Sequence, residues 1–525
     1  MMNMINAFAT QSRNPPPPEL SSKRPTAEEI QAISLENLLP SSQDQIRQTD
    51  ESIVMVMRML CKHIAAFKNV EVEQHISHPY TDESSKKTPV VSQYIMISMH
   101  FKIFDTGHML HKKPFLLNRV PMGVKKYDEN KPGDIIDFLH ELHTYVPQDI
   151  LGMALEIVLF GDGLTAERIL AAQKGRKNGE SMVDMLIGVV PAAQDWHKRV
   201  LLLQDDWDTL YGEDLGARDI GTLVYLRNRY CHTSVTKDVS HCFQDAYELL
   251  EFVTTAYVVA MAMHIMGIDD PKEIPNDLPE SSSDLSKYAQ DVSREIVEFS
   301  IIEAPKDAYL KYEDLQEDLD DDVIDSEVSD MEEEDEVKEE EDYDELCLCK
   351  QQQASSSPML YCNNRFCTLG SWFHYDCIGI TSDTVPKGIW FCSKACEADS
   401  KKKKKDVQIK VDGKRQYARG IISAGLKAIC RRDAVHENDG LRIIRHWKED
   451  LLQFHVQKHP KYLNLGTHML LCVSGAVSER LRHSLMWDRT VNTVGGKGNN
   501  ISQDKYNELL NGAYKGTSTV NVFHK

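Results

Sequence analysis

Seven cysteines and one histidine lie within 50 residues of this 525-residue chain, from Cys347 to Cys396. The rest of the chain contains only five cysteines, so the cluster does not look like a scatter of buried core thiols. Zinc ions bind thiolate sulfur and imidazole nitrogen, four ligands at a time in a tetrahedron. The cluster therefore predicts two zinc ions. Neighbouring ligands form the pairs Cys347/Cys349, Cys362/Cys367, His374/Cys377 and Cys392/Cys396.

The spacing alone does not say which pairs share a metal ion. The ligand order is four cysteines, one histidine and three cysteines, with W-F-H-x-x-C at Trp372–Cys377 and W-F-C at Trp390–Cys392. This pattern resembles a PHD finger, although three residues rather than the usual two separate the last pair. Metal binding supplies much of the folding free energy of so small a segment. The resemblance implies interleaving, with Cys347, Cys349, His374 and Cys377 on one zinc and Cys362, Cys367, Cys392 and Cys396 on the other.

The finger is most similar to those of inhibitor-of-growth proteins, which share its S-x-x-x-M-x-x-C and W-F-H-x-x-C layout. PHD fingers bind histone tails, often by enclosing methyl-lysine between aromatic faces. The resemblance implies Trp372 and Met359 as ligand-binding residues, with Tyr361 as a partial substitute for a cage tyrosine. The cage tyrosine position holds Ser356, and the usual acid is Asn363. Methyl-lysine binding, binding of an unmodified tail, and a purely structural finger therefore all stay open.

Charge is distributed unevenly on both sides of the finger. The net charge is −21, and residues 313–345 alone hold 21 acidic residues and one lysine. Residues 401–432 hold 12 basic residues and two aspartates, starting with Lys401–Lys405. We expect the acidic run to be a disordered linker that attracts basic partners. The lysine run indicates nuclear import, with contacts to DNA phosphates as the other interpretation, and we expect a nuclear protein.

Hydrophobic periodicity outside the finger predicts a mainly α fold with a small α/β core. The apolar run Phe252–Met266 is shorter than the ~20 residues of a membrane span, so we expect a buried helix and no membrane. A short strand at Leu155–Phe160 is expected to enter Gly161-Asp162-Gly163 and then a helix. Another strand is predicted at Val91–Phe104, and further helices at Ser42–Lys68, Asp134–Tyr145, most of Val183–Met266, and Leu441–Val456.

Several motifs of the remaining chain resemble the domain of unknown function 6589, a family frequent in invertebrate and fungal proteins of mobile-element character. They are GDGLTAERILAAQ at Gly161–Gln173, D-W-H at Asp195–His197, N-D-G-L-R at Asn438–Arg442, and W-D-R-T-V-N with G-G-K-G-N-N-I at Trp487–Ile501. The resemblance implies no established activity. The predicted organisation is a disordered tail (1–40), a first part of a large helical α/β domain (41–312), a disordered acidic linker (313–345), the PHD-type finger (346–398), a basic linker (399–432) and the second part of the large domain (433–518).

Two functions from different classes follow. The first is a zinc-binding, chromatin-associated protein whose finger recognises a histone tail or another protein. The alternative is a transposon-derived protein with a ribonuclease-H-like core, in which Asp105, Asp162 and Glu508 hold metal ions. That core requires the three carboxylates to converge on one point. The simpler interpretation is that these acids cap helices and turns, as we also expect of Asp504 at the start of the last helix, and no catalytic residue is assigned.

Overall fold

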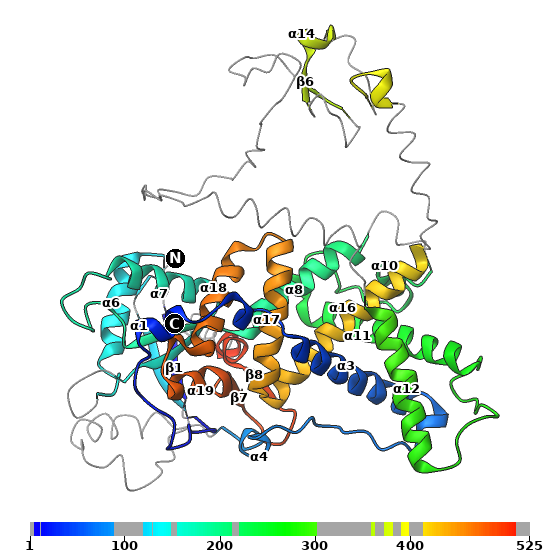
Figure 1. Ribbon diagram of the computed structural model, residues 1–525, viewed down its shortest axis with the longest axis horizontal. Helices are drawn as coiled ribbons and strands as arrows, with labels where there is room; N and C mark the ends of the chain where they lie inside the picture. The colour runs from blue at the N-terminus through cyan, green and yellow to red at the C-terminus, as the bar shows by residue number, and fades with distance from the viewer. Residues whose placement is uncertain are drawn as a thin grey trace, which may run out of the picture. The chain divides into compact units, whose positions relative to one another are not determined.

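The computed structural model describes residues 5–10, 12–88, 119–125, 127–128, 130–148, 155–212, 220–301, 359–362, 372–381, 390–397 and 413–510. The chain divides into a large unit, residues 1–302 with 417–525, and a small unit, residues 303–416. The predicted strand Val91–Phe104 and the acidic run 313–345 lie outside the described residues. The helices of the large unit pack against one another (Figure 1).

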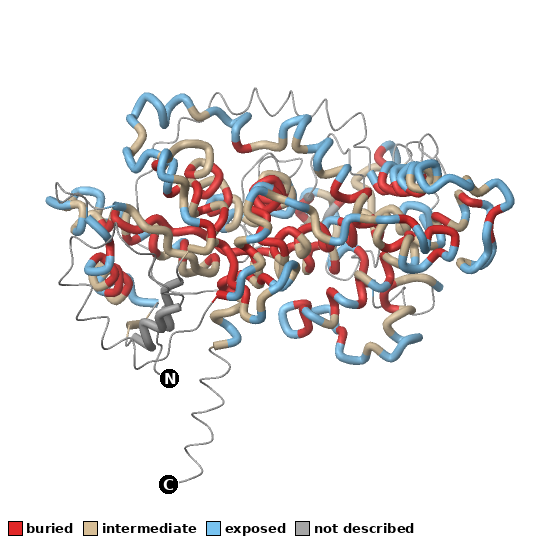
Figure 2. Tube along the Cα trace, turned by 90° about the horizontal axis from the view of Figure 1, so that it is seen from below, coloured by how far each residue is buried: buried red, intermediate tan, exposed pale blue. Residues whose placement is uncertain are grey.

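The large unit is mainly helical, as predicted. Its first hydrophobic cluster joins α3 (Ser42–His63), α11 (Val239–Met266), α12 (Ser282–Ser300) and α16 (Gly413–Glu437). The side chains of Val56, Val258, Ile296 and Ile422 meet there and are fully or almost fully buried. Helices from both ends of the sequence therefore build one core. Figure 2 shows buried stretches of the chain toward the middle and exposed stretches on the outside.

Two further clusters extend this core. One lies between α8 (Asp195–Leu210), α10 (Leu223–Arg229), α11 and α16. The other is formed mainly by α17 (Gly440–Val456) and α18 (Pro460–Leu471), and α19 (Glu479–Trp487) follows them in the chain. Trp447 on α17 is completely buried in the last of these clusters. The predicted helix Leu441–Val456 is therefore confirmed.

A small parallel α/β element is built into this helical unit. Strand β3 (Ile157–Gly161) leads into α7 (Gly163–Gly175) and pairs in parallel with β4 (Val189–Ala193). Helix α6 (Pro132–His143) packs on α7. The strand, glycine turn and helix predicted around Asp162 are confirmed. Strand β4 was not predicted, because its short apolar run lies inside a stretch interpreted as helical.

The other described strands form three short antiparallel pairs. Strand β1 (Ile5–Thr10) pairs with β2 (Arg119–Lys125), and β7 (Thr490–Asn492) pairs with β8 (Asn500–Ser502). The loop between β7 and β8 contains three glycines with positive φ, as a tight turn requires. The third pair belongs to the small unit and joins β5 (Met359–Tyr361) to β6 (Trp372–His374).

The prediction that residues 1–40 form a disordered tail is wrong for those of them that the structure describes. Helices α1 (Ala27–Gln31) and α2 (Leu35–Leu38) form there, and Leu38 is buried against the α17–α18 cluster. The Asn14 side chain is buried and donates a hydrogen bond to the Trp487 carbonyl at 3.2 Å. The polar composition concealed this order, because contacts with residues more than 400 positions away supply it.

The predicted basic linker 399–432 is also wrong from residue 413 onward, where α16 begins. Its apolar residues Ile421, Ile422 and Leu426 are buried, and its basic Arg431 pairs with a carboxylate at 2.6 Å. The prediction considered only the charge of this segment and missed its apolar residues, which recur at helical spacing.

Helix α11 is long and apolar enough to cross a membrane, by length and composition alone. It contributes, however, to two hydrophobic clusters of the large unit, as a core helix does.

Candidate functional site

Three predicted zinc ligands converge in the small unit. Cys362 directly follows β5, and Cys392 and Cys396 flank the start of a helical turn at residues 394–397. Their Sγ atoms all lie within 4.8 Å of one another. In a tetrahedron with Zn–S bonds of ~2.3 Å, two sulfurs are ~3.8 Å apart. The three thiols are thus placed as corners of one zinc site, and no other such group of three occurs among the described residues.

A second pair of predicted ligands lies together in the same unit. His374 ends β6, and Cys377 lies in the single-turn helix α14 (Tyr375–Ile378). The His374 Nδ1 and Cys377 Sγ atoms are 3.7 Å apart, close to the edge of a tetrahedron that has one nitrogen and one sulfur corner. The remaining predicted ligands, Cys347, Cys349 and Cys367, lie outside the described residues.

The predicted peptide-binding residues lie on the two paired strands of the small unit, β5 and β6. Tyr361 is the cross-strand partner of Trp372, and Met359 is the partner of His374. Between these pairs, Phe373 is fully buried and packs edge-on against Trp390, with ring centroids 5.8 Å apart. Phe373, Trp390 and the cysteines form the only hydrophobic cluster found in the described part of this unit. Such a small core is what makes metal binding important for its stability.

The large unit is organised around buried ion pairs. Glu51 on α3 accepts hydrogen bonds from Arg442 at 2.9 Å, Arg445 at 2.6 Å and His446 at 3.2 Å, all on α17. Burial disfavours the charged carboxylate, but His446 and Arg442 outweigh it and hold the pKa of Glu51 well below its usual range. Arg442 also pairs with Asp433 at 2.7 Å. The group joins the first and last thirds of the chain.

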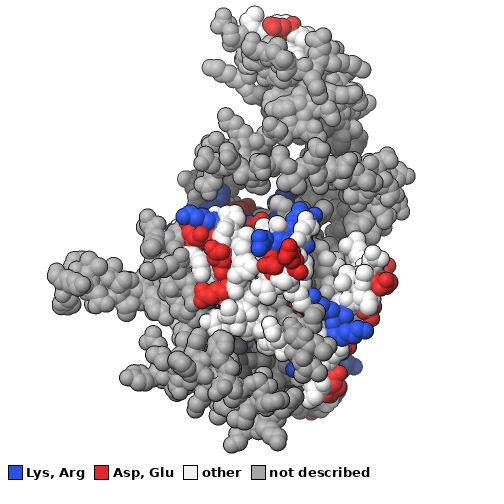
Figure 3. Space-filling view, turned by 90° about the vertical axis from the view of Figure 1, so that its left-hand side faces the viewer, with Lys and Arg blue, Asp and Glu red and all other residues white. Residues whose placement is uncertain are grey.

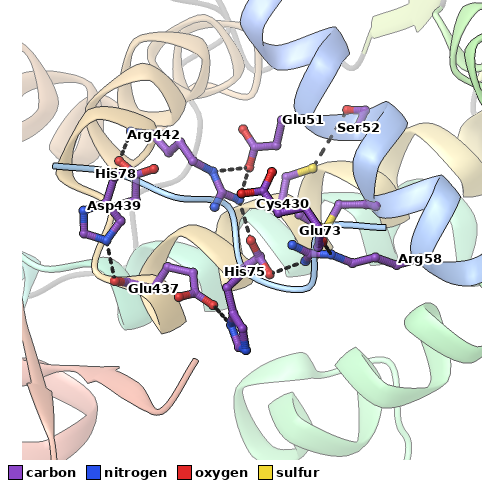
Figure 4. A network of polar contacts seen from close by, with 12 residues as sticks. Glu51, Ser52, Arg58, Glu73, His75, His78, Cys430, Glu437, Asp439 and Arg442 are labelled. Carbon is purple, nitrogen blue, oxygen red and sulfur yellow. Dashed lines mark hydrogen bonds and ion pairs between the residues drawn. The ribbon is translucent and has the colours of Figure 1, made fainter. Parts of the chain in front are cut away.

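The segment around residues 73–78 lies along the same network. His75 Nδ1 is 2.7 Å from a carboxylate oxygen of Glu437, and His78 Nε2 is 3.0 Å from the Glu437 carbonyl (Figure 4). Asp439 accepts hydrogen bonds from the backbone N–H groups of Leu441 and Arg442 and so caps α17. The N-D-G-L-R motif therefore starts a helix and supplies an ion-pair partner for Glu51.

Two other motifs meet in a second buried network. Asp195 of the D-W-H motif accepts from Arg489 of the W-D-R motif at 2.7 Å and from the Trp447 indole at 2.8 Å. Lys198, one helical turn after Asp195, donates to Asp450 at 2.7 Å. Arg489 is completely buried. The charged residues of these motifs thus satisfy one another inside the fold.

Two of the carboxylates singled out in the sequence, Asp162 and Asp504, act as helix caps, one of them at an unexpected helix. Asp162 accepts from the Thr165 N–H at 2.7 Å and caps α7. Within the first turn of its own helix (503–510), Asp504 accepts from the Lys505 N–H at 2.9 Å. Its carboxylate accepts from the Trp196 and His197 N–H groups, both at 3.0 Å, and so caps α8. An exposed helix N-terminus attracts an acid from anywhere in the fold, and the sequence shows only local candidates.

Asp504 also lies 3.1 Å from Nδ1 of His197. Burial disfavours the imidazolium, but the hydrogen bond and charge of Asp504, with the charges of Asp162 and Glu508, raise the pKa of His197 above its usual value.

The nuclease hypothesis requires Asp105, Asp162 and Glu508 to converge, and Asp105 lies outside the described residues. Neither Asp162 nor Glu508 belongs to a group of three converging ligand atoms among the described residues, so that hypothesis gains no geometric support.

These features define a class of protein: a mainly helical domain that contains a small parallel α/β element, with a cysteine-rich unit between its two parts. The chain belongs to the Family of unknown function (DUF6589), whose profile matches residues 28–520. No solved structure matches the chain.

Several curated proteins match a short segment of the chain. Inhibitor of growth protein 5 of Drosophila melanogaster is 49% identical over 57 residues, which is 11% of this chain and 18% of that protein. Protein YNG1 of Saccharomyces cerevisiae is 43% identical over 51 residues, 10% of this chain and 21% of that protein. Chromatin modification-related protein YNG2 of Candida albicans is 38% identical over 65 residues, 12% and 22% of the two chains. The match therefore spans about a fifth of each of these relatives.

Replacing Glu51 by Gln should destabilise the large unit. The substitution removes the charge that compensates Arg442 and Arg445 inside the protein, and breaking a buried ion pair on one side costs about 3–5 kcal/mol. Urea unfolding followed by far-UV circular dichroism measures the loss. Glu167→Gln breaks a half-exposed pair with Lys461 and should cost less than about 1 kcal/mol. Equal losses in the two variants would contradict the importance of the buried network.

Replacing Asp504 by Asn should change how stability depends on pH. Because the folded-state pKa of His197 is raised, the stabilisation is complete below its unfolded pKa of about 6.5 and is lost as pH rises through the folded value. Asn still accepts backbone hydrogen bonds but removes the charge, so the difference in unfolding free energy between wild type and variant should shrink as pH rises. Unfolding from pH 5 to 9 measures it.

The matched control for this experiment is Asp238→Asn, which changes an exposed aspartate–histidine pair with His241. Its effect should be small at every pH, because exposed pairs contribute little. A wild-type-to-variant difference for Asp504 that stays constant from pH 5 to 9 would contradict the proposed coupling to His197.

Proposed function

We propose that this chain is a zinc-binding, chromatin-associated protein whose PHD-like finger, residues 346–398, binds a histone tail or another peptide. The observation that carries the proposal is the convergence of Cys362, Cys392 and Cys396 within 4.8 Å. The segment shared with inhibitor of growth and YNG proteins is about as long as this finger. One of these relatives is itself named a chromatin modification-related protein.

The zinc assignment has two ions in interleaved sites. Cys362, Cys392 and Cys396, with Cys367, hold one ion, and His374 and Cys377, with Cys347 and Cys349, hold the other. Two observations support this pairing: the three converging thiols come from the second and fourth ligand pairs, and His374 lies beside Cys377 at 3.7 Å. Zinc here holds a small fold together, and its ligands leave no position for a reacting water.

Peptide binding is assigned to the β5–β6 ladder and the residues around it. Trp372 and Tyr361 are partners on that ladder, and Met359 lies two residues before Tyr361. The sequence thus supplies two aromatic residues on this ladder, and a methylated ammonium group is attracted to aromatic faces. Ser356 and Asn363 replace the usual cage tyrosine and acid. The ligand is therefore a methylated tail held by a reduced cage, or an unmodified basic tail.

Partners other than a peptide have less support. On the face drawn in Figure 3, described acidic and basic side chains are interspersed, so the described residues of this face form no patch of one sign for a nucleic acid. Lys401–Lys405 is the strongest basic run in the sequence. We assign it to nuclear import, with DNA phosphates as a second target.

Native mass spectrometry of the full chain tests the metal assignment. Wild type should carry two zinc ions, and Cys396→Ser and His374→Ala should each lower the count, because each removes a ligand from a different site. Cys231→Ser changes an exposed cysteine of the large unit and should keep both ions. A wild-type count of zero, or an unchanged count in both finger variants, would contradict the assignment.

Binding of the zinc-loaded full chain to histone-tail peptides, with and without lysine methylation, tests the function. Trp372→Ala should weaken binding at least tenfold if stacking on this indole contributes about 1.4 kcal/mol or more. Phe252→Ala, an exposed aromatic of the large unit, should leave binding unchanged. Binding of neither methylated nor unmodified tails by a chain with two zinc ions would refute peptide recognition and leave a structural finger.

A further inference from the structure

Gln194 is buried without the hydrogen bonds that its side chain needs. It is 1% exposed, and neither its amide nitrogen nor its amide oxygen has a hydrogen-bond partner among the described residues. Leaving a buried polar group without a hydrogen bond is energetically costly. Such a residue in an ordered part of the fold indicates a missing partner.

The strand register places this amide beside Asp162. Gly161 of β3 is aligned with Ala193 of β4, so the next aligned pair is Asp162 with Gln194. The Gln194 N–H donates to the Gly161 carbonyl at 3.0 Å, and both Asp162 and Gln194 have extended backbones. Aligned residues of parallel strands project to the same face of a sheet. The unsatisfied amide and the Asp162 carboxylate therefore share one face at the carboxyl end of the strand pair.

A second carboxylate reaches this edge from the end of the described chain. Asp504 is fixed on the N-terminus of α8, two to three residues after Gln194. Glu508 lies one turn further along helix 503–510, on the same face as Asp504. The charges of Asp162 and Glu508 both contribute to the raised pKa of His197, whose ring lies 3.1 Å from Asp504. Glu508 is exposed, which leaves a route from solvent.

We propose that Asp162, Glu508 and the Gln194 amide oxygen bind a divalent cation of the Mg²⁺/Mn²⁺ class. Carboxylate and amide oxygens are the ligands that these hard cations take, with water completing the shell. The cation neutralises two carboxylates and gives the buried amide its partner. The side chains gather by rotation on binding, because two carboxylates repel each other when no cation lies between them.

Capping leaves Asp162 able to serve in this site. Only its Oδ1 is bonded to the Thr165 N–H, and the other oxygen has no hydrogen bond among those found in the described residues. Asp504 is a positioning residue, since its oxygens hold α8 and the His197 ring. Gly163, next to Asp162, lets α18 come close to the carboxyl end of β3, because a Cβ at this position would lie 3.0 Å from the Tyr462 hydroxyl.

The test is a titration of the zinc-loaded full chain with Mn²⁺, in which electron paramagnetic resonance measures the concentration of free Mn²⁺. Asp162→Asn retains helix capping, because Asn is as good an N-cap as Asp, but it removes the charge. Asp162→Asn and Glu508→Gln should each weaken one class of Mn²⁺ site at least tenfold. Glu167→Gln, on the exposed side of α7, should leave it unchanged. The acidic run 313–345 is present in every variant, so its weak binding cancels in the comparison.

Terbium luminescence gives an independent readout of location. The Trp196 ring lies 4.5 Å from the His197 ring, so this indole should sensitise a Tb³⁺ ion in the site. Trp196→Phe should lower the emission while leaving Mn²⁺ affinity unchanged. Wild-type Mn²⁺ affinity in Glu508→Gln, which alters an exposed side chain and keeps the fold, would overturn the proposal even if Asp162→Asn failed to fold.

Discussion

The large unit depends on the pairing of Glu51 with Arg442, Arg445 and His446. These residues lie 391–395 positions apart in sequence and meet in the interior. Removing charges from water is costly, so each member requires the others to be in place. The pairing therefore makes α3 and α17 parts of one cooperative structure. Buried ion pairs of this kind are better evidence for a unique arrangement of helices than for high stability, because apolar side chains of similar volume would often stabilise the core as well.

This constraint explains how the sequence of the large unit tolerates the insertion of a second unit. The large unit is built from residues 1–302 and 417–525, and α12 and α16, on either side of the insertion, pack in the same hydrophobic cluster. The entropy of closing a flexible loop grows slowly, by about 0.6 kcal/mol for each doubling of its length. A long insertion is therefore thermodynamically tolerable once its two ends are held by packing and ion pairs. The small unit needs its own source of stability, which the proposed metal binding by the cysteine cluster would supply.

The sequence predicted the features whose physics is local. Helical periodicity identified α6 and α17, and the Gly161-Asp162-Gly163 turn correctly predicted a strand, a cap and a helix. Cysteine spacing selected the three thiols that converge, because ligand chemistry limits the residue types. What failed were features that depend on distant partners. Asn14 is ordered by Trp487, and Asp504 caps a helix that begins 309 residues earlier, at Asp195. Neither partner is apparent from the neighbouring sequence.

The charged motifs of the large unit illustrate a further distinction. Asp195 and Arg489 have the residue types of a catalytic site, yet each is fully paired inside the protein and inaccessible. Asp162, Gln194 and Glu508 differ in kind, since Gln194 is a buried amide without a partner in the part of the chain that the structure describes, and Glu508 is an exposed carboxylate. A group that is satisfied internally is explained by stability alone, whereas a buried group without a partner among the described residues calls for one. By this criterion the carboxyl end of β3 and β4, and not the more conspicuous ion-pair network, is where we place the proposed cation site.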